Sequence, residues 1–194
     1  FLRSGNSVTV PTESTLFFED DGKLIVEEGA ELNILDNANL SAISGADSLI
    51  VYGSLVVGNN VHFSVSEDAS LVIDIRNSEL SETIYGASFE NVTIIGTANS
   101  LYFSSCSFTN SFIEMHHNEN CHYLFYQSDF DNTPLIACRV GLGPFIYRDG
   151  IIVISGCDFI NGAGLHVIKI ESFPNFLIMN TNLSYGEGDG IGLY

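Results

Sequence analysis

Short runs in which apolar and polar residues alternate make up most of this chain. In the first third, three such runs are followed by a close echo of the same three: residues 16–18, 22–26 and 30–34, then 49–51, 53–57 and 61–65. Alternation with period 2 over four or five residues, between turn residues such as Gly58-Asn59-Asn60, predicts short β-strands. No stretch shows an apolar stripe with a period of 3.6 residues, so we expect little or no helix.

A five-residue phrase recurs through the rest of the chain: a small residue, a spacer, Phe, a spacer and Asn. Its four copies are residues 87–91, 106–110, 128–132 and 157–161, and residues 181–185 form a degraded fifth copy. The Phe residues are 19, 22 and 29 positions apart. A supersecondary unit that recurs at such a period is typical of solenoids, so we predict an all-β solenoid with coils of roughly 20–25 residues.

Aligning the copies on their Phe predicts which positions face the core. The apolar or small columns are Leu101/Tyr123/Ile152/Phe176, Ile84/Phe103/Phe125/Ile154/Ile178, Ala87/Cys106/Ser128/Cys157/Thr181 and Phe89/Phe108/Phe130/Phe159/Leu183. Stacked coils would place the four Phe rings in one aromatic column. The Asn after each Phe would occupy a turn with left-handed backbone, where its amide can bond the Asn of the neighbouring coil.

The four cysteines are too few for a disulfide framework. Cys106 and Cys157 share one column two coils apart, at about 10 Å, because neighbouring strands lie about 4.8 Å apart. A disulfide needs Cα atoms within about 7 Å, so we expect both to be small buried side chains without a mutual bond. Cys121 and Cys138 would pair only if their loops meet, and the sequence leaves this open.

The net charge of −18 limits the partners of this protein. With only six Lys and Arg against 24 Asp and Glu, the surface would repel nucleic acids, anionic membranes and polyuronates. The same surface favours weak cation binding. No run of 18 or more apolar residues occurs, so we expect no insertion into a membrane.

These coils resemble the right-handed parallel β-helix family, in which Gly-x-Leu-x-Val coils lead into Phe-x-Asn coils. The resemblance points to secreted and cell-surface proteins of bacteria in the pectate-lyase-like superfamily. It predicts a lead-in or cap at residues 1–14 and one domain at residues 15–194, with Gly-x-Leu coils over 15–75 and Phe-x-Asn coils over 76–194. The start at Phe1 and the strand-like end at residues 190–194 suggest a piece of a longer chain.

Three aspartates and one arginine are the candidates for catalysis. Pectate-lyase-like enzymes hold calcium with acidic side chains beside a basic residue, and the resemblance gives these roles to Asp129, Asp131 and Asp158, with Arg139 over them. Ca²⁺ is the one cofactor that it suggests. Two carboxylates of this group could also serve a glycoside hydrolase. Alternatively, these aspartates occupy outward and turn positions and only face solvent.

Three histidines form the densest group of metal-ligand residue types. His116, His117 and His122 lie beside Glu114, Glu119 and Cys121, with spacings like those of zinc sites. The alternative interpretation of residues 115–121 is a polar surface turn between two strands.

We expect a non-catalytic β-helix segment of a secreted or surface-anchored bacterial protein, a stalk or adhesive surface with weak binding to a glycan or a cell-surface protein. The first alternative is a carbohydrate-active enzyme, either a polysaccharide lyase or a glycoside hydrolase, or its binding fragment. The second alternative is the shaft of a phage tailspike, which would be trimeric.

Overall fold

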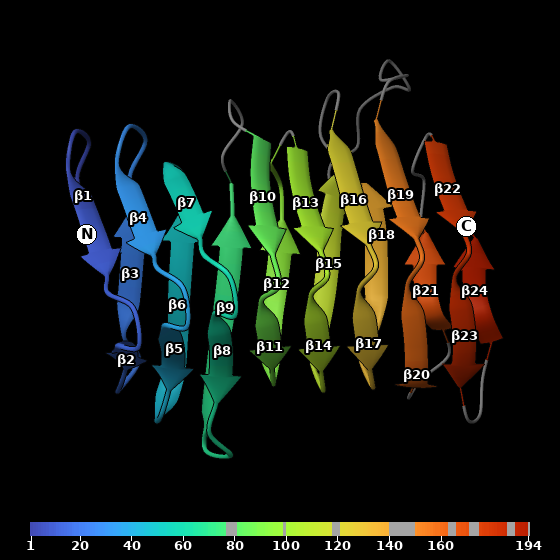
Figure 1. The fold of residues 1–194 in the computed structure, drawn as a ribbon, viewed down its shortest axis with the longest axis horizontal. Helices are drawn as coiled ribbons and strands as arrows, with labels where there is room; N and C mark the ends of the chain where they lie inside the picture. Colours follow the sequence, from blue (N-terminus) through green and yellow to red (C-terminus); the bar gives the residue numbers. More distant parts are fainter. Residues whose placement is uncertain are drawn as a thin grey trace.

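The protein is a solenoid of short parallel β-strands. The computed structural model describes residues 1–76, 81–98, 100–117, 121–139, 150–162, 166–170, 175–185 and 189–193. Within these residues there are 24 strands and no helix. Strands three apart in the chain pair in parallel, as β1 does with β4. The exception is β7 and β10, which share no ladder. The chain descends through β1 and β2 in front, ascends through β3 behind them and advances from left to right in Figure 1, so the solenoid is right-handed.

The strands form three faces around one apolar core. One face holds a three-stranded sheet and then a five-stranded sheet: β1 (Ser7–Val10), β4 (Glu31–Ile34), β7 (Ser54–Val57); β10 (Ser81–Tyr85), β13 (Ser100–Ser104), β16 (His122–Tyr126), β19 (Ile151–Ser155), β22 (Asn175–Met179). The second face is the β2 sheet: β2 (Thr15–Phe18), β5 (Asn39–Ala42), β8 (His62–Val65), β11 (Ser88–Glu90), β14 (Ser107–Thr109), β17 (Asp129–Asp131), β20 (Asp158–Gly162), β23 (Asn182–Tyr185). The third face is the β3 sheet: β3 (Lys23–Val26), β6 (Gly45–Val51), β9 (Ala69–Ile75), β12 (Val92–Gly96), β15 (Phe112–His117), β18 (Leu135–Arg139), β21 (His166–Ile170), β24 (Asp189–Leu193). Strand β1 pairs with β4, so residues 7–10 are already part of the solenoid.

The predicted aromatic column is present in the core. Phe89, Phe108, Phe130 and Phe159 are register partners on successive strands and are at most 2% exposed. Their ring centroids lie 5.1, 4.9 and 4.1 Å apart in stacked pairs. The column also includes Phe63, stacked 4.6 Å from Phe89. The two types of coil therefore share one continuous core.

The Asn turns have the predicted backbone but only part of the predicted ladder. Asn91, Asn110, Asn132 and Asn161 all have φ between 47° and 59°. Asn132 donates to the side chain of Asn110 at 2.9 Å, as expected. The prediction of a continuous asparagine ladder was wrong at both ends, because Asn161 donates to Asp131 and Asn91 donates to the carbonyl of Val65. A carboxylate is a stronger acceptor than an amide oxygen, which accounts for the first of these exchanges.

A second column of left-handed turns lies at the preceding corner of the coils. Its members are Gly86, Ser105, Gln127, Gly156 and Asn180, with φ between 48° and 66°. The backbone N–H groups of the first four donate to carbonyls of the next coil at 2.9 Å. The interstrand ladder therefore continues around the corner and holds the coils in register.

The thiols of Cys106 and Cys157 are buried and unbonded to one another, as predicted. Each Sγ donates to a carbonyl oxygen of the preceding coil, that of Ile84 for Cys106 and that of Phe125 for Cys157. Cys121 is buried too, and the side chain of Cys138, its possible partner in the sequence, lies outside the described residues.

The buried thiol of Cys106 should make the free energy of unfolding depend on pH in the alkaline range. Burial raises its pKa from 9.0 to about 11, although nearby backbone groups oppose the shift. Between these values the folded chain keeps a proton that the unfolded chain has lost, so stability falls as the pH rises from 9 to 11. In urea titrations at several pH values, we expect a loss on the order of 2 kcal/mol relative to Cys106→Ala. Parallel pH profiles for the two proteins would contradict this.

Candidate functional site

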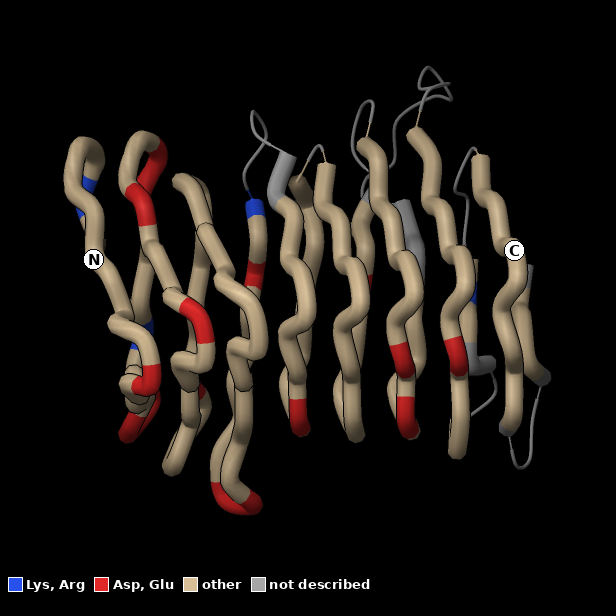
Figure 2. Tube along the Cα trace, viewed as in Figure 1, with Lys and Arg blue, Asp and Glu red and all other residues tan. Residues whose placement is uncertain are grey.

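The structure brings three of the predicted acidic residues together on the outside of the β2 sheet. Asp129 and Asp131 flank Phe130 on β17, and because Phe130 faces the core both carboxylates face outward. Asp158 on β20 is the register partner of Asp129. Together with Ile160 and Asn182, the three aspartates line an open depression of about 580 Å³, which we call the acidic depression. Figure 2 shows acidic positions low on the front strands, where β17 and β20 are drawn in Figure 1.

Two of these carboxylates are bonded to asparagines of neighbouring coils. Asp131 Oδ1 accepts from Asn161 Nδ2 at 2.8 Å, and Asp158 Oδ1 accepts from Asn182 Nδ2 at 2.6 Å. Both bonds run along the solenoid axis, from one coil to the next. The depression therefore offers a row of oxygen acceptors in register, suited to hydroxyl groups.

Arg139 is placed on another face. It is the last residue of β18 in the β3 sheet, where it pairs with His117, whereas the aspartates lie in the β2 sheet. Its side chain lies outside the described residues, so its predicted reach over the aspartates stays a prediction.

The three candidate histidines are distributed over two strands. The interpretation of residues 115–121 as a turn was wrong at its start, because His116 and His117 belong to β15. His116 Nε2 lies 2.7 Å from Glu114 Oε1 on the same strand. His122 begins β16 in the five-stranded sheet, and the side chain of His117 is not described. Among the described residues, no three His, Cys, Asp or Glu side chains form a group that could hold a metal ion.

The sequence did not reveal an ion pair on the β3 sheet between a buried carboxylate and an exposed guanidinium. Asp74 is 6% exposed and accepts from Arg76 Nε at 2.7 Å, while Arg76 Nη1 donates to the hydroxyl of Tyr52 at 2.9 Å. The hydrogen bond with Asp74 raises the pKa of Arg76, so the guanidinium stays charged. An Asp two residues before an Arg is ordinary in a surface strand, and only the burial of Asp74 sets this pair apart.

A hydroxyl, an imidazole and a carboxylate also meet on the outside of the β2 sheet. Ser88 Oγ lies 2.5 Å from His62 Nδ1, and Glu90 Oε2 lies 3.7 Å from His62 Nε2. The second distance exceeds hydrogen-bond range, and the histidine side chain is 40% exposed. This group lacks the tight base-to-carboxylate contact that activates a serine.

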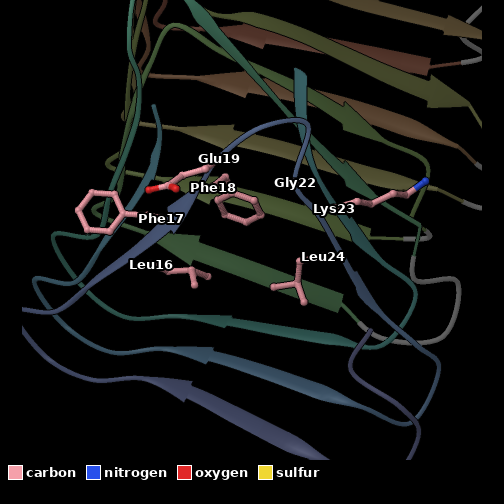
Figure 3. A pocket seen from close by; sticks show the side chains of 7 residues that line it. All are labelled: Leu16, Phe17, Phe18, Glu19, Gly22, Lys23 and Leu24. Atoms are coloured by element: carbon pink, nitrogen blue, oxygen red, sulfur yellow. The ribbon is translucent and has the colours of Figure 1, made fainter. Parts of the chain in front are cut away.

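A second depression, of about 430 Å³, lies between β2 and β3. Figure 3 shows Leu16, Phe18 and Leu24 around it, with the side chains of Phe17 and Lys23 directed away. Leu16 and Leu24 are half-buried and pack against the core. The depression is thus an uncovered part of the apolar interior, and none of the candidate residues lines it.

Comparison of this sequence and structure with known proteins identified no relative. No family model matches this chain, and no curated protein or solved structure matches it either. The β-helix architecture therefore rests on the pairing of the strands. Within the described residues, no helix could cross a membrane.

Proposed function

We propose that this chain is a non-catalytic β-helix segment of a secreted or surface-anchored bacterial protein, in the manner of the pectate-lyase-like superfamily. It serves as a stalk and presents an adhesive surface to a glycan or a cell-surface protein. With its net charge of −18 it binds no nucleic acid, and it does not insert into a membrane.

The bonding of the acidic depression carries this proposal. Asp131 and Asp158 each accept from an asparagine of another coil at 2.8 Å or less, so one oxygen of each carboxylate is part of the axial ladder. A general acid or a nucleophile needs its carboxyl group directed at one reacting atom. Carboxylates held in a row along the axis instead suit many weak contacts with hydroxyl groups.

The test combines turnover with binding. We expect no reducing ends and no unsaturated products when the protein is incubated with a panel of polysaccharides, with and without Ca²⁺. We also expect fluorescently labelled protein to adhere to cells or to immobilised glycans. Product formation that Asp158→Ala abolishes and Glu67→Gln preserves would overturn the non-catalytic role, because Glu67 is an exposed acid at another turn.

The alternative is a carbohydrate-active enzyme, a polysaccharide lyase or glycoside hydrolase, or its binding fragment. The pairing of Asp129 with Asp158 on adjacent strands, beside Asp131, favours it. Adjacent strands lie about 4.8 Å apart, close to the carboxyl separation of about 5–5.5 Å in retaining glycosidases. Asp129, Asp131 and Asp158 would then act on a sugar or bind Ca²⁺, with Arg139 as the basic group. A sedimentation mass three times that of the chain would instead favour the tailspike shaft.

A further inference from the structure

The outer face of the five-stranded sheet carries three tyrosines around one serine. Ser104 on β13 is in register with Tyr85 on β10 and with Tyr126 on β16. Tyr102 precedes Ser104 by two residues, so it points to the same side of the sheet. Tyr85 and Tyr126 are 53% and 42% exposed. We call these four residues the tyrosine notch.

Large and small side chains alternate along the solenoid axis at this position. The register column runs Tyr85, Ser104, Tyr126, Ser155, Met179. Each serine therefore lies at the floor of a gap between two large side chains. Because adjacent strands are about 4.8 Å apart, the walls of one gap stand roughly 10 Å apart. A gap of this width admits one planar or chair-shaped ring.

No side chain that the structure describes on the outside of this sheet carries a formal charge, although the protein is strongly acidic. Its other described outward residues are Thr83, Ser100, His122, Leu124, Ile151, Val153, Asn175 and Leu177, and none of them is Asp, Glu, Lys or Arg. In Figure 2 the strands β13, β16, β19 and β22 of this sheet are accordingly drawn without acidic or basic positions. Since the chain carries −18 overall, this face is where a neutral ligand meets the least competing charge.

The size of the face favours a narrow ligand over a stable protein interface. Five strands at about 4.8 Å and five residues at about 3.3 Å cover on the order of 400 Å². A standard protein–protein interface buries about 800 Å² on each partner, about twice as much. A linear chain that lies along the axis needs only the column of alternating side chains.

We propose that the tyrosine notch binds a neutral glycan chain that lies along the solenoid axis. One pyranose ring rests over Ser104 with its C–H face against a tyrosine ring, and its hydroxyls bond the Ser104 and tyrosine hydroxyls. Tyrosine suits this contact because its ring is apolar and its tip is polar. This inference rests on the proposed adhesive role. It specifies a neutral glycan as the ligand and the tyrosine notch as the binding site.

Affinity electrophoresis tests the notch. The protein is run in gels that contain laminarin, dextran, galactomannan or xyloglucan, with polygalacturonate as the anionic comparison. We expect retardation by at least one neutral polysaccharide and none by polygalacturonate. Tyr85→Ala/Tyr126→Ala should weaken this binding about tenfold, since two aromatic contacts are lost. Tyr126→Phe keeps the ring and should retain most of the binding.

Phe17→Ala is the matched control, because Phe17 is an aromatic residue that is 56% exposed on a different face. Circular dichroism melts confirm that the variants are folded. Equal retardation of the double variant and the native protein would overturn the notch, as would the absence of retardation in all four neutral gels.

Two outcomes separate this proposal from the adhesive role. Binding that survives the double tyrosine variant but is lost in Asp129→Asn/Asp158→Asn would move the ligand to the acidic depression and leave the adhesive role intact. Adhesion to cells could also depend on the tyrosines and yet persist after the cell-surface glycans are removed enzymatically. That result would overturn the glycan as the ligand and indicate a protein partner.

Discussion

Phe130→Ala is expected to lower the free energy of unfolding by about 3–5 kcal/mol, the usual cost of removing a buried aromatic ring. Phe130 is fully buried, between the rings of Phe108 at 4.9 Å and Phe159 at 4.1 Å. The cavity cannot collapse along the axis, because hydrogen-bonded strands on both sides hold the coils at their spacing. Urea denaturation with constant slope, comparing midpoints, measures this loss.

Two substitutions serve as controls for the aromatic column. Phe17→Ala removes the same atoms from a side chain that is 56% exposed, so its effect should stay within about 0.5 kcal/mol. Phe130→Leu leaves a smaller cavity and should fall between the two. A loss below about 1 kcal/mol for Phe130→Ala would be incompatible with the stacked column.

Arg76→Ala should have the second largest effect, a loss of about 3 kcal/mol. Removing one partner of a buried ion pair costs about 3–5 kcal/mol, and we take the low end because the Arg76 side chain is 43% exposed. The variant leaves the carboxylate of Asp74 buried with one oxygen that already lacks a hydrogen bond. Thermal or urea denaturation at pH 7 measures the change.

Asp74→Ile gives the matched control for the ion pair. In the register column of the β3 sheet, Asp74 stands between Ile50 and Ile95, so isoleucine fits the existing pattern. Replacing a buried charge with a well-packed apolar residue is often neutral or stabilising. We therefore expect Asp74→Ile to abolish most of the cost of Arg76→Ala. Equal losses from Arg76→Ala with and without Asp74→Ile would mean that the guanidinium acts through packing alone.

The apolar columns could be read from the sequence because the same residue type recurs in the same phrase. Phe89, Phe108, Phe130 and Phe159 share the phrase and share the column. Phe63 was missed because its run, residues 61–65, lacks the terminal Asn, although its ring continues the stack. The repeated residues around each Phe revealed the core column. The same approach failed at Phe63, where the surrounding residues differ although the backbone position is the same.

The corners and the outer contacts were less accessible to sequence reasoning. Ser105, Gln127 and Gly156 share a left-handed backbone without sharing a residue type, so no pattern indicated their column. The outward position of Asp129 and Asp158 followed from alternation with Phe. Their asparagine partners did not, because such contacts depend on the register of coils whose connections differ in length. The tyrosine notch likewise exists only once Tyr85, Ser104 and Tyr126 are paired.

The parallel ladders also determine how this molecule would respond to force. The hydrogen bonds of the parallel ladders point along the solenoid axis. Tension applied along that axis therefore pulls each bond along its own direction and breaks the bonds of a ladder one after another, without sliding one strand past the next. The coils interact mainly with their neighbours, so they would detach from an end in succession. Each coil of about 24 residues would release roughly 80 Å of extended chain. A stalk of this construction would lengthen in steps under load and absorb work while the coils beyond the break stay folded.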